Sequence, residues 1–129
     1  MKNIYLNIYK PNSINLKKAK KNVESNNIIG LPTETVYGLA GNAYSDKSVK
    51  KIFDLKRRPA INPLIVHFKN LTNLKKDAIC NDSFIKLYKV LCPGPITFIL
   101  KKNTKSKISK IATAGKQTIA VRIPKHKIA

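Results

Sequence analysis

Apolar residues along this 129-residue chain form short strand-like runs that alternate with one-sided helical stripes. Strand-like runs lie at 4–9, 28–32, 63–68, 96–102 and 117–123, and an extended segment with two glycines occupies 34–43. Helical stripes occupy 14–27, 45–56 and 83–92. This order of elements predicts one α+β domain in which helices pack against a mixed sheet.

Polar residues that can cap a helix precede each helical stripe. Ser13 precedes the first stripe, Ser45 and Asp46 open the second, and Asn81 and Asp82 can cap the third. The side-chain oxygens of these residue types accept hydrogen bonds from the free N–H groups of a first helical turn. We therefore expect the helices to begin at these positions.

The second stripe is the most sharply delimited of the three. Its apolar residues are Val49, Ile52, Phe53 and Leu55. Pro59 cannot lie inside a helix and disfavours helical backbone at the residue before it. The helix is therefore expected to end close to the adjacent Arg57 and Arg58.

The chain is strongly basic, with a formal net charge of +20, and its positive charge comes almost entirely from lysine. Such a charge is typical of proteins that bind nucleic acid or nucleotide phosphates. Lysine-rich segments such as 17–21 and 101–110 are equally explained as solvated surface, since lysine is frequent throughout the chain. Charge alone therefore does not establish RNA binding.

The three arginines stand out in this lysine-rich chain. Arginine presents a planar fork that grips phosphate or carboxylate in two places, whereas lysine acts as a mobile point charge. Lys56 and Arg58 lie two positions apart where a helix gives way to extended chain, so both can face one anion. The alternative is that these cations only complement the C-terminus of the helix.

Arg122 and His67 both occur within apolar strand-like runs. A buried guanidinium needs an anionic partner, and the chain has only six carboxylate side chains, so a ligand carboxylate is a reasonable partner for Arg122. An exposed edge-strand arginine and a core histidine are the alternatives. Together the two residues would suit the binding of an amino acid.

Hydroxyl groups gather in the segment "LPTETVYGLAG". Thr33, Thr35 and Tyr37 would share one face if the backbone is extended, because alternate strand residues point the same way. Threonine is common in strands for structural reasons, because β-branched side chains pack well there. The flanking Pro32 and Gly38 favour a loop shaped against a ligand.

Several kinds of functional site are excluded by their missing motifs. The segment 41–48 lacks the second glycine of a phosphate-binding P-loop, and no G-x-S-x-G or H-E-x-x-H sequence occurs. Cys80 and Cys92 are twelve positions apart without a close partner, so no metal site is expected. No apolar run approaches the roughly 20 residues that cross a bilayer, and we expect a cytoplasmic protein.

Four stretches in order along the chain resemble the YrdC-like family of L-threonylcarbamoyladenylate synthases: "LPTETVYGLAGNA", "KRRPAINPLIVHF", "LCPGPITFIL" and "TIAVRIPKHKIA". The resemblance covers about residues 13–129. It implies a three-layer α+β fold with a twisted mixed sheet and a positively charged concave site.

The resemblance also implies roles for individual residues. Lys56 and Arg58 match the catalytic K-x-R element that holds ATP phosphates, with Arg57 at its variable position. The other ATP-contacting positions are matched by Asn62 and Thr118. The positions that bind L-threonine are matched by Thr35, His67 and Arg122.

The activity implied by this resemblance joins L-threonine, bicarbonate and ATP into threonylcarbamoyl-AMP with release of pyrophosphate. Mg²⁺ would accompany ATP. A threonylcarbamoyl transferase complex would then pass the group to the adenosine beside the anticodon of tRNA.

The family pattern continues beyond the last residue of this chain into a Ser-x-Asn element. We therefore expect residues 1–129 to be the N-terminal portion, about two-thirds, of one domain, with a helix beginning after residue 123. The isolated chain is expected to be inactive or weakly active. Two alternatives remain: a module that binds double-stranded RNA, or the carbamoyl-adenylate chemistry of hydrogenase maturation.

Overall fold

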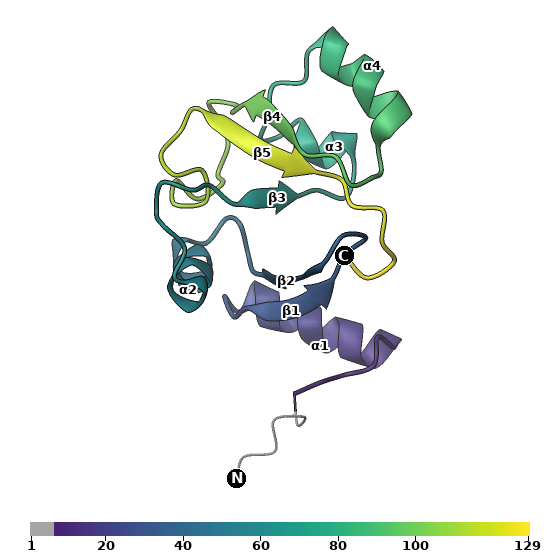
Figure 1. The fold of residues 1–129 in the computed structure, drawn as a ribbon, viewed down its shortest axis with the longest axis vertical. Helices are drawn as coiled ribbons and strands as arrows, with labels where there is room; N and C mark the ends of the chain where they lie inside the picture. The colour runs from purple at the N-terminus through teal and green to yellow at the C-terminus, as the bar shows by residue number, and fades with distance from the viewer. Residues whose placement is uncertain (1–6) are drawn as a thin grey trace.

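The computed structural model describes residues 7–129, which contain four helices and five strands. In chain order these are α1 (Ser13–Glu24), β1 (Ile29–Pro32), β2 (Tyr37–Ala40), α2 (Asp46–Lys56), β3 (Ile65–His67), α3 (Leu71–Leu74), α4 (Asp82–Leu91), β4 (Phe98–Lys101) and β5 (Thr118–Arg122) (Figure 1). The α+β class is confirmed. Part of the strand expected at 4–9 lies outside the described residues, and residues 7–9 form no strand.

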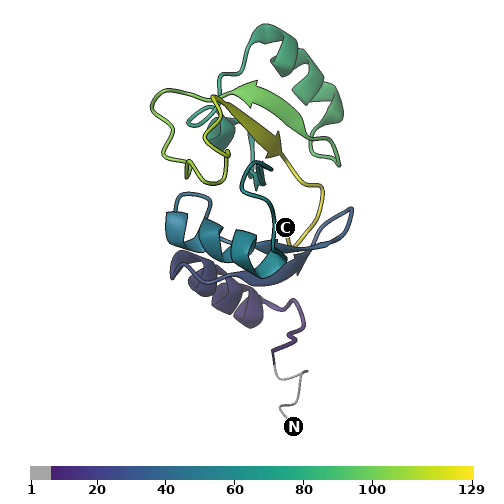
Figure 2. The same ribbon diagram turned by 60° about the vertical axis from the view of Figure 1, so that its left-hand side comes forward.

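The strands are shared between two sheets. One is a three-stranded mixed sheet with the order β3-β5-β4, in which β3 runs parallel and β4 antiparallel to β5. The other is the antiparallel pair β1-β2. Figures 1 and 2 show α3 and α4 on one side of the three-stranded sheet and the β1-β2 hairpin with α1 on the other side.

One face of the three-stranded sheet forms the core of the protein. Ile119 and Val121 of β5 are 1% and 0% exposed, and they belong to a buried cluster with Leu74 of α3 and Phe84 of α4. The ring of Phe84 meets that of Phe98 on β4 edge-on, with 5.1 Å between centroids. Burial of this face supplies the main apolar stabilisation of the sheet.

The opposite face of the sheet is open. Strand alternation places Ile65 and His67 of β3 on it, beside Ala120 and Arg122 of β5. Its aliphatic members include Ile65 and Ile99, which are 46% and 65% exposed. This open face therefore combines apolar surface with polar side chains, as ligand-binding surfaces do.

The β1-β2 hairpin turns at Thr33–Val36, where an extended segment was expected. The Thr33 hydroxyl donates to the Val36 carbonyl at 2.7 Å and accepts from the backbone N–H groups of Thr35 and Val36 at 3.2 Å. In this turn the Thr33 and Thr35 hydroxyls lie 3.0 Å apart, whereas Tyr37 begins β2 and is 82% exposed, so the predicted shared face holds only for the two threonines. The strand expected to be buried at 28–32 is only half-buried.

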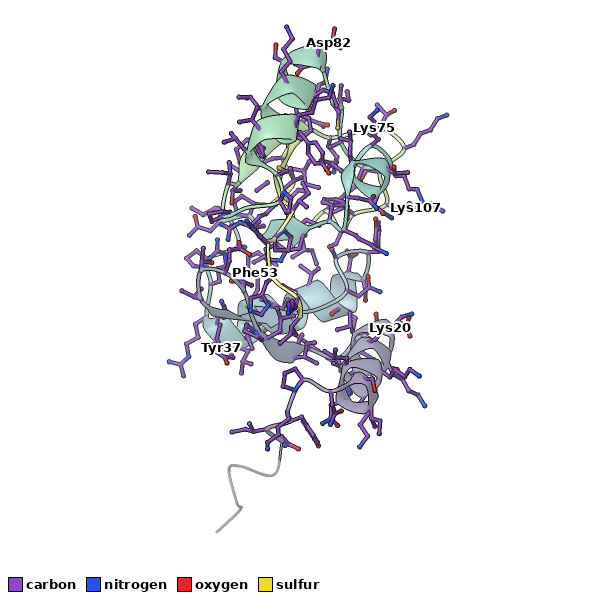
Figure 3. All side chains as sticks on the ribbon, turned by 90° about the vertical axis from the view of Figure 1, so that its right-hand side faces the viewer. Lys20, Tyr37, Phe53, Lys75, Asp82 and Lys107 are labelled. Carbon is purple, nitrogen blue, oxygen red and sulfur yellow. The ribbon has the colours of Figure 1, made fainter. Side chains whose placement is uncertain are left out.

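Helix α2 follows the sequence prediction closely. Ser45 caps its N-terminus by accepting from the Ser48 N–H, and Val49, Ile52 and Phe53 are buried. Leu55 is an exception, because it is 65% exposed. Figure 3 shows Phe53 among the interior side chains, while Lys20, Lys75 and Lys107 extend outward from three different segments.

The end of α2 is formed by Arg57 in the left-handed conformation, with φ of 49°. The N–H groups of Arg57 and Arg58 donate to the carbonyls of Asp54 and Phe53, which closes the helix two residues before Pro59. Such a helix end usually has glycine, since a side chain is strained there. Arg57 thus has a backbone role that the sequence did not indicate.

The remaining helices show two further differences from the sequence predictions. Helix α1 is capped by Asn12 rather than Ser13, and it buries none of its residues. The short helix α3 was not predicted; it begins after Asn70, whose side chain accepts from the Asn73 N–H. Helix α4 is capped by Asn81, as predicted. No helix forms in 124–129, where the start of one was expected.

A buried aspartate holds the long connection between β4 and β5. Asp77 is 2% exposed and accepts hydrogen bonds from the hydroxyls of Tyr44 and Ser106 at 2.6 and 2.7 Å. Burial and this bond to Asp77 raise the pKa of Tyr44 to about 12. The connection leads from β4 to the start of β5. Its attachment to Asp77 therefore helps to position β5 and the polar residues that β5 carries.

Candidate functional site

Two of the predicted site residues are neighbours across the parallel strand pair. His67 is the last residue of β3 and Arg122 the last of β5, and the two are register partners. Parallel register partners project from the same face of a sheet. His67 and Arg122 therefore lie side by side at one end of the open face.

Hydrogen bonds from three nitrogen atoms hold the Arg122 guanidinium in place. Its Nε and Nη2 atoms donate to the Thr97 hydroxyl at 3.1 and 2.8 Å, and Nη1 donates to the Thr35 hydroxyl at 3.3 Å. A guanidinium has five N–H donors, so two remain after these bonds. The structure thus brings together all three residues expected at a threonine site, and adds Thr97.

Glu34 supplies the carboxylate beside Arg122. Its Oε1 lies 3.7 Å from Nη1 of Arg122, and both side chains are 14% exposed. The sequence led us to expect a ligand carboxylate here because few carboxylates were available, and that expectation overlooked Glu34. The neighbouring Thr33 and Thr35 drew attention to this segment, but the pairing spans 88 positions and no sequence signal marks it.

The charges of Arg122 and Glu34 shift the pKa of His67 in opposite directions. Loss of solvent around the ring lowers the pKa of His67 from its usual value, and the nearby Arg122 lowers it further, while Glu34 raises it. One side of this residue still reaches solvent. The lowered pKa keeps the imidazole neutral at pH 7, so that it offers one donor and one acceptor to a ligand.

The predicted phosphate-binding residues lie elsewhere, at the end of α2 and in the loop that follows. Arg58 donates from Nε to the Asn62 carbonyl at 3.0 Å and from Nη2 to the Pro63 carbonyl at 2.8 Å. These bonds brace the loop and leave three N–H groups of the guanidinium for other partners. Lys56 ends α2, and both it and Asn62 are exposed.

Thr118 lies at the other end of β5 from Arg122. Four positions along a strand correspond to about 13 Å, and the even spacing places both residues on the open face. Thr118 is exposed and pairs with Lys101 of β4. The seven predicted positions, counting Thr35 and His67, therefore do not form one cluster; they span the length of the open face and the loop beside it.

A metal ion in this site would need oxygen ligands from the surrounding side chains. Mg²⁺ is bound in proteins through carboxylate oxygens and water. Within residues 7–129 no group of three His, Cys, Asp or Glu side chains lies close enough to hold a metal ion. Both oxygens of Glu34 are buried beside Arg122, so the described residues do not fit a protein-held Mg²⁺.

No helix in the described part of the chain is long and apolar enough to cross a membrane.

Fold and site together define a class of α+β domain in which a hairpin turn lies at one end of an open sheet face and places Glu34 and Thr35 beside Arg122. The family model for Sua5, YciO and YrdC, described as "Telomere recombination", matches residues 21–129. The chain belongs to this Sua5/YciO/YrdC family. The family resemblance expected from the sequence is confirmed.

Two curated relatives illustrate the similarity. A threonylcarbamoyl-AMP synthase of Pyrococcus abyssi is 41% identical over 110 residues, which cover 83% of this chain and 31% of that protein. A threonylcarbamoyl-AMP synthase of Bacillus subtilis is 37% identical over 119 residues, covering 92% of this chain and 34% of that protein. The chain thus spans about a third of the length of these two relatives.

Solved structures agree with the family assignment. Pyrococcus abyssi Sua5 complexed with L-threonine superposes with a TM-score of 0.86 at 36% identity, covering 93% of this chain and 35% of that chain. Escherichia coli YciO superposes with a TM-score of 0.80 at 22% identity, covering 92% of this chain and 57% of that chain. The second likeness is one of fold alone.

Proposed function

We propose that this chain carries the amino-acid-binding half of a threonylcarbamoyl-AMP synthase. The observation that carries the proposal is the convergence of Thr35, His67 and Arg122 at one end of the open face, with two Arg122 N–H groups left for a carboxylate. A relative that is 36% identical is named as complexed with L-threonine, which supports the same substrate here.

In the proposed complex Arg122 binds the carboxylate of L-threonine through its remaining N–H groups. Arg–carboxylate pairs are among the stronger hydrogen-bonded contacts in proteins. The neutral imidazole of His67 and the hydroxyl of Thr35 lie beside Arg122 and would contact the substrate's polar groups. The site would thus orient the amino acid before any chemistry takes place.

The proposed reaction consumes L-threonine, bicarbonate and ATP. The threonine nitrogen forms an N-carboxylate from bicarbonate with loss of water. An oxygen of this carboxylate attacks the α-phosphorus of ATP, the bond to the β-phosphate breaks, and pyrophosphate leaves. The product, threonylcarbamoyl-AMP, would be the donor for a tRNA-modifying transferase complex, and the reaction would take place in the cytoplasm.

Lys56, Arg58 and Asn62, in and after the end of α2, and Thr118 on the open face are proposed to contact ATP. Electrostatic stabilisation by cations is the main contribution that proteins make to phosphoryl and nucleotidyl transfer. Arg58 has three N–H groups for this task after it braces its loop. Mg²⁺ is proposed to arrive with the triphosphate as part of the substrate.

Calorimetric titration with L-threonine tests the proposal on the 129-residue chain. Arg122→Lys keeps the positive charge but removes the fork, and should weaken binding at least tenfold, or about 1.4 kcal/mol. Arg57→Lys is the matched control, since Arg57 has no proposed ligand contact, and should bind as the wild type does. Undetectable binding by the wild type, or equal losses in both variants, would overturn the proposal.

Pyrophosphate release measured with and without L-threonine and bicarbonate tests the chemistry separately. Any turnover should require both L-threonine and bicarbonate; ATP consumption that ignores threonine would exclude this substrate.

A further inference from the structure

Glu34 is unusual among the six acidic residues of the chain. Both of its carboxylate oxygens are buried, and they accept no hydrogen bond from any residue in 7–129. Burying a carboxylate without hydrogen-bond donors is costly. A residue placed at this cost usually serves a site rather than the stability of the fold.

The backbone around Glu34 is held firmly even though its carboxylate accepts no hydrogen bond from the described residues. It lies in the Thr33–Val36 turn, which three hydrogen bonds of the Thr33 hydroxyl hold in shape. The turn belongs to the β1-β2 sheet, whereas Arg122 belongs to the β3-β5-β4 sheet. The ion pair of Glu34 with Arg122 therefore joins the two sheets at the proposed amino-acid site.

Arg122 is held from two sides. Thr97, directly before β4, accepts hydrogen bonds from two of its N–H groups, while Glu34 and Thr35 approach Nη1 from the hairpin turn. Threonine hydroxyls orient a guanidinium but do not balance its charge. Within the described chain, Glu34 is the carboxylate paired with Arg122.

We propose that Glu34 is a positioning residue, whose ion pair holds the Arg122 guanidinium in the orientation that receives the carboxylate of the amino-acid substrate. Glu34 itself does not touch the substrate, because its oxygens have no accessible surface. The inference deepens the proposed function and rests on it for the identity of the ligand. The geometry of the pair is testable without any ligand.

The test compares Glu34→Gln with Glu34→Asp and with Glu24→Gln. The first removes the charge at nearly constant shape, and the second keeps the charge on a shorter side chain. Glu24 lies on α1 with its side chain 62% exposed and pairs with Lys20, so Glu24→Gln is a matched loss of one carboxylate at the surface. Thermal unfolding of each variant checks that it is folded.

The ligand-free readouts are the NMR signal of the Arg122 side-chain N–H at Nε and the titration of His67. We expect Glu34→Gln to shift the Arg122 signal and to lower the pKa of His67, because the charge of Glu34 raises that pKa in the wild type. Glu34→Asp should restore part of both changes, and Glu24→Gln should cause neither. If neither readout changes in a folded Glu34→Gln variant, the inference is wrong.

The ligand readout is the affinity for L-threonine. We expect Glu34→Gln to bind roughly tenfold more weakly, which corresponds to about 1.4 kcal/mol, with Glu34→Asp intermediate and Glu24→Gln unchanged. Equal binding by wild type and Glu34→Gln would overturn the positioning role. If the wild type binds no threonine while the Arg122 signal still depends on Glu34, the proposed substrate fails and the ion pair itself stands.

Discussion

The two faces of the three-stranded sheet use the same strands for different purposes. On β5, Ile119 and Val121 are buried to 1% and 0% exposure, whereas Thr118 and Arg122 lie on the open face. Because strand residues alternate, the buried positions of β5 stabilise the fold while the positions between them are available for the proposed ligand contacts. Substitutions on the two faces should therefore have separable effects.

The largest effect is expected on the buried face. Ile119→Ala removes a fully packed side chain and should lower the free energy of unfolding by about 2–5 kcal/mol. Its matched control is Ile99→Ala on the open face, where the side chain is 65% exposed and the change should stay within about 0.5 kcal/mol. Urea unfolding measures both. Equal losses would show that the two faces are not distinct.

The next effect concerns the support of Arg122. Thr97→Val keeps the shape of the side chain but removes the hydroxyl that accepts from Nε and Nη2. We expect roughly a tenfold weaker affinity for L-threonine, while Thr97→Ser, which retains the hydroxyl, should stay close to the wild type. Calorimetry distinguishes the two, and identical affinities would show that Thr97 does not orient the guanidinium.

The loop that Arg58 braces should respond differently from the threonine end. Arg58→Lys cannot reproduce its two bonds to the Asn62 and Pro63 carbonyls. ATP affinity is expected to fall severalfold while L-threonine affinity stays unchanged. A loss of threonine binding in this variant would mean that the loop after α2 and the threonine end of the open face are coupled.

The smallest effect is a dependence of stability on pH. The pKa of His67 is lower in the folded chain than its usual value because of burial and Arg122. The unfolded state therefore takes up a proton first, so stability should decrease as the pH falls from about 6.5 through the folded pKa. His67→Asn should flatten this part of the curve. An unchanged slope between pH 7 and pH 5 would contradict the assignment.

Local signals in the sequence predicted much of the fold. The Ser45 cap, the apolar stripe of α2 and Pro59 lie within fifteen positions, so local chemistry determines that helix. The Asn81 cap was equally readable. Leu55 was misassigned because a stripe indicates an apolar face without showing which of its edges the fold leaves in solvent.

Features that depend on distant parts of the chain were not predicted. The turn at Thr33–Val36 is local, but it uses hydrogen bonds of the Thr33 hydroxyl beside a backbone bond from the Thr33 N–H to the Val36 carbonyl, which an alternating pattern does not reveal. The pairing of Glu34 with Arg122 depends on how two sheets meet. His67 and Arg122 were predicted to act together because both lie in apolar strand-like runs, and the family resemblance matched both to threonine-binding positions, whereas no sequence feature pointed to Thr97.

The most direct test of the account is to map L-threonine binding on the ¹⁵N-labelled 129-residue chain by NMR. We predict saturable shifts concentrated at Thr35, His67 and Arg122 and at their neighbours on the open face, with none at the buried end of α4 around Phe84. An absence of saturable shifts, or shifts centred away from the open face, would contradict the central claim that this face binds the amino acid.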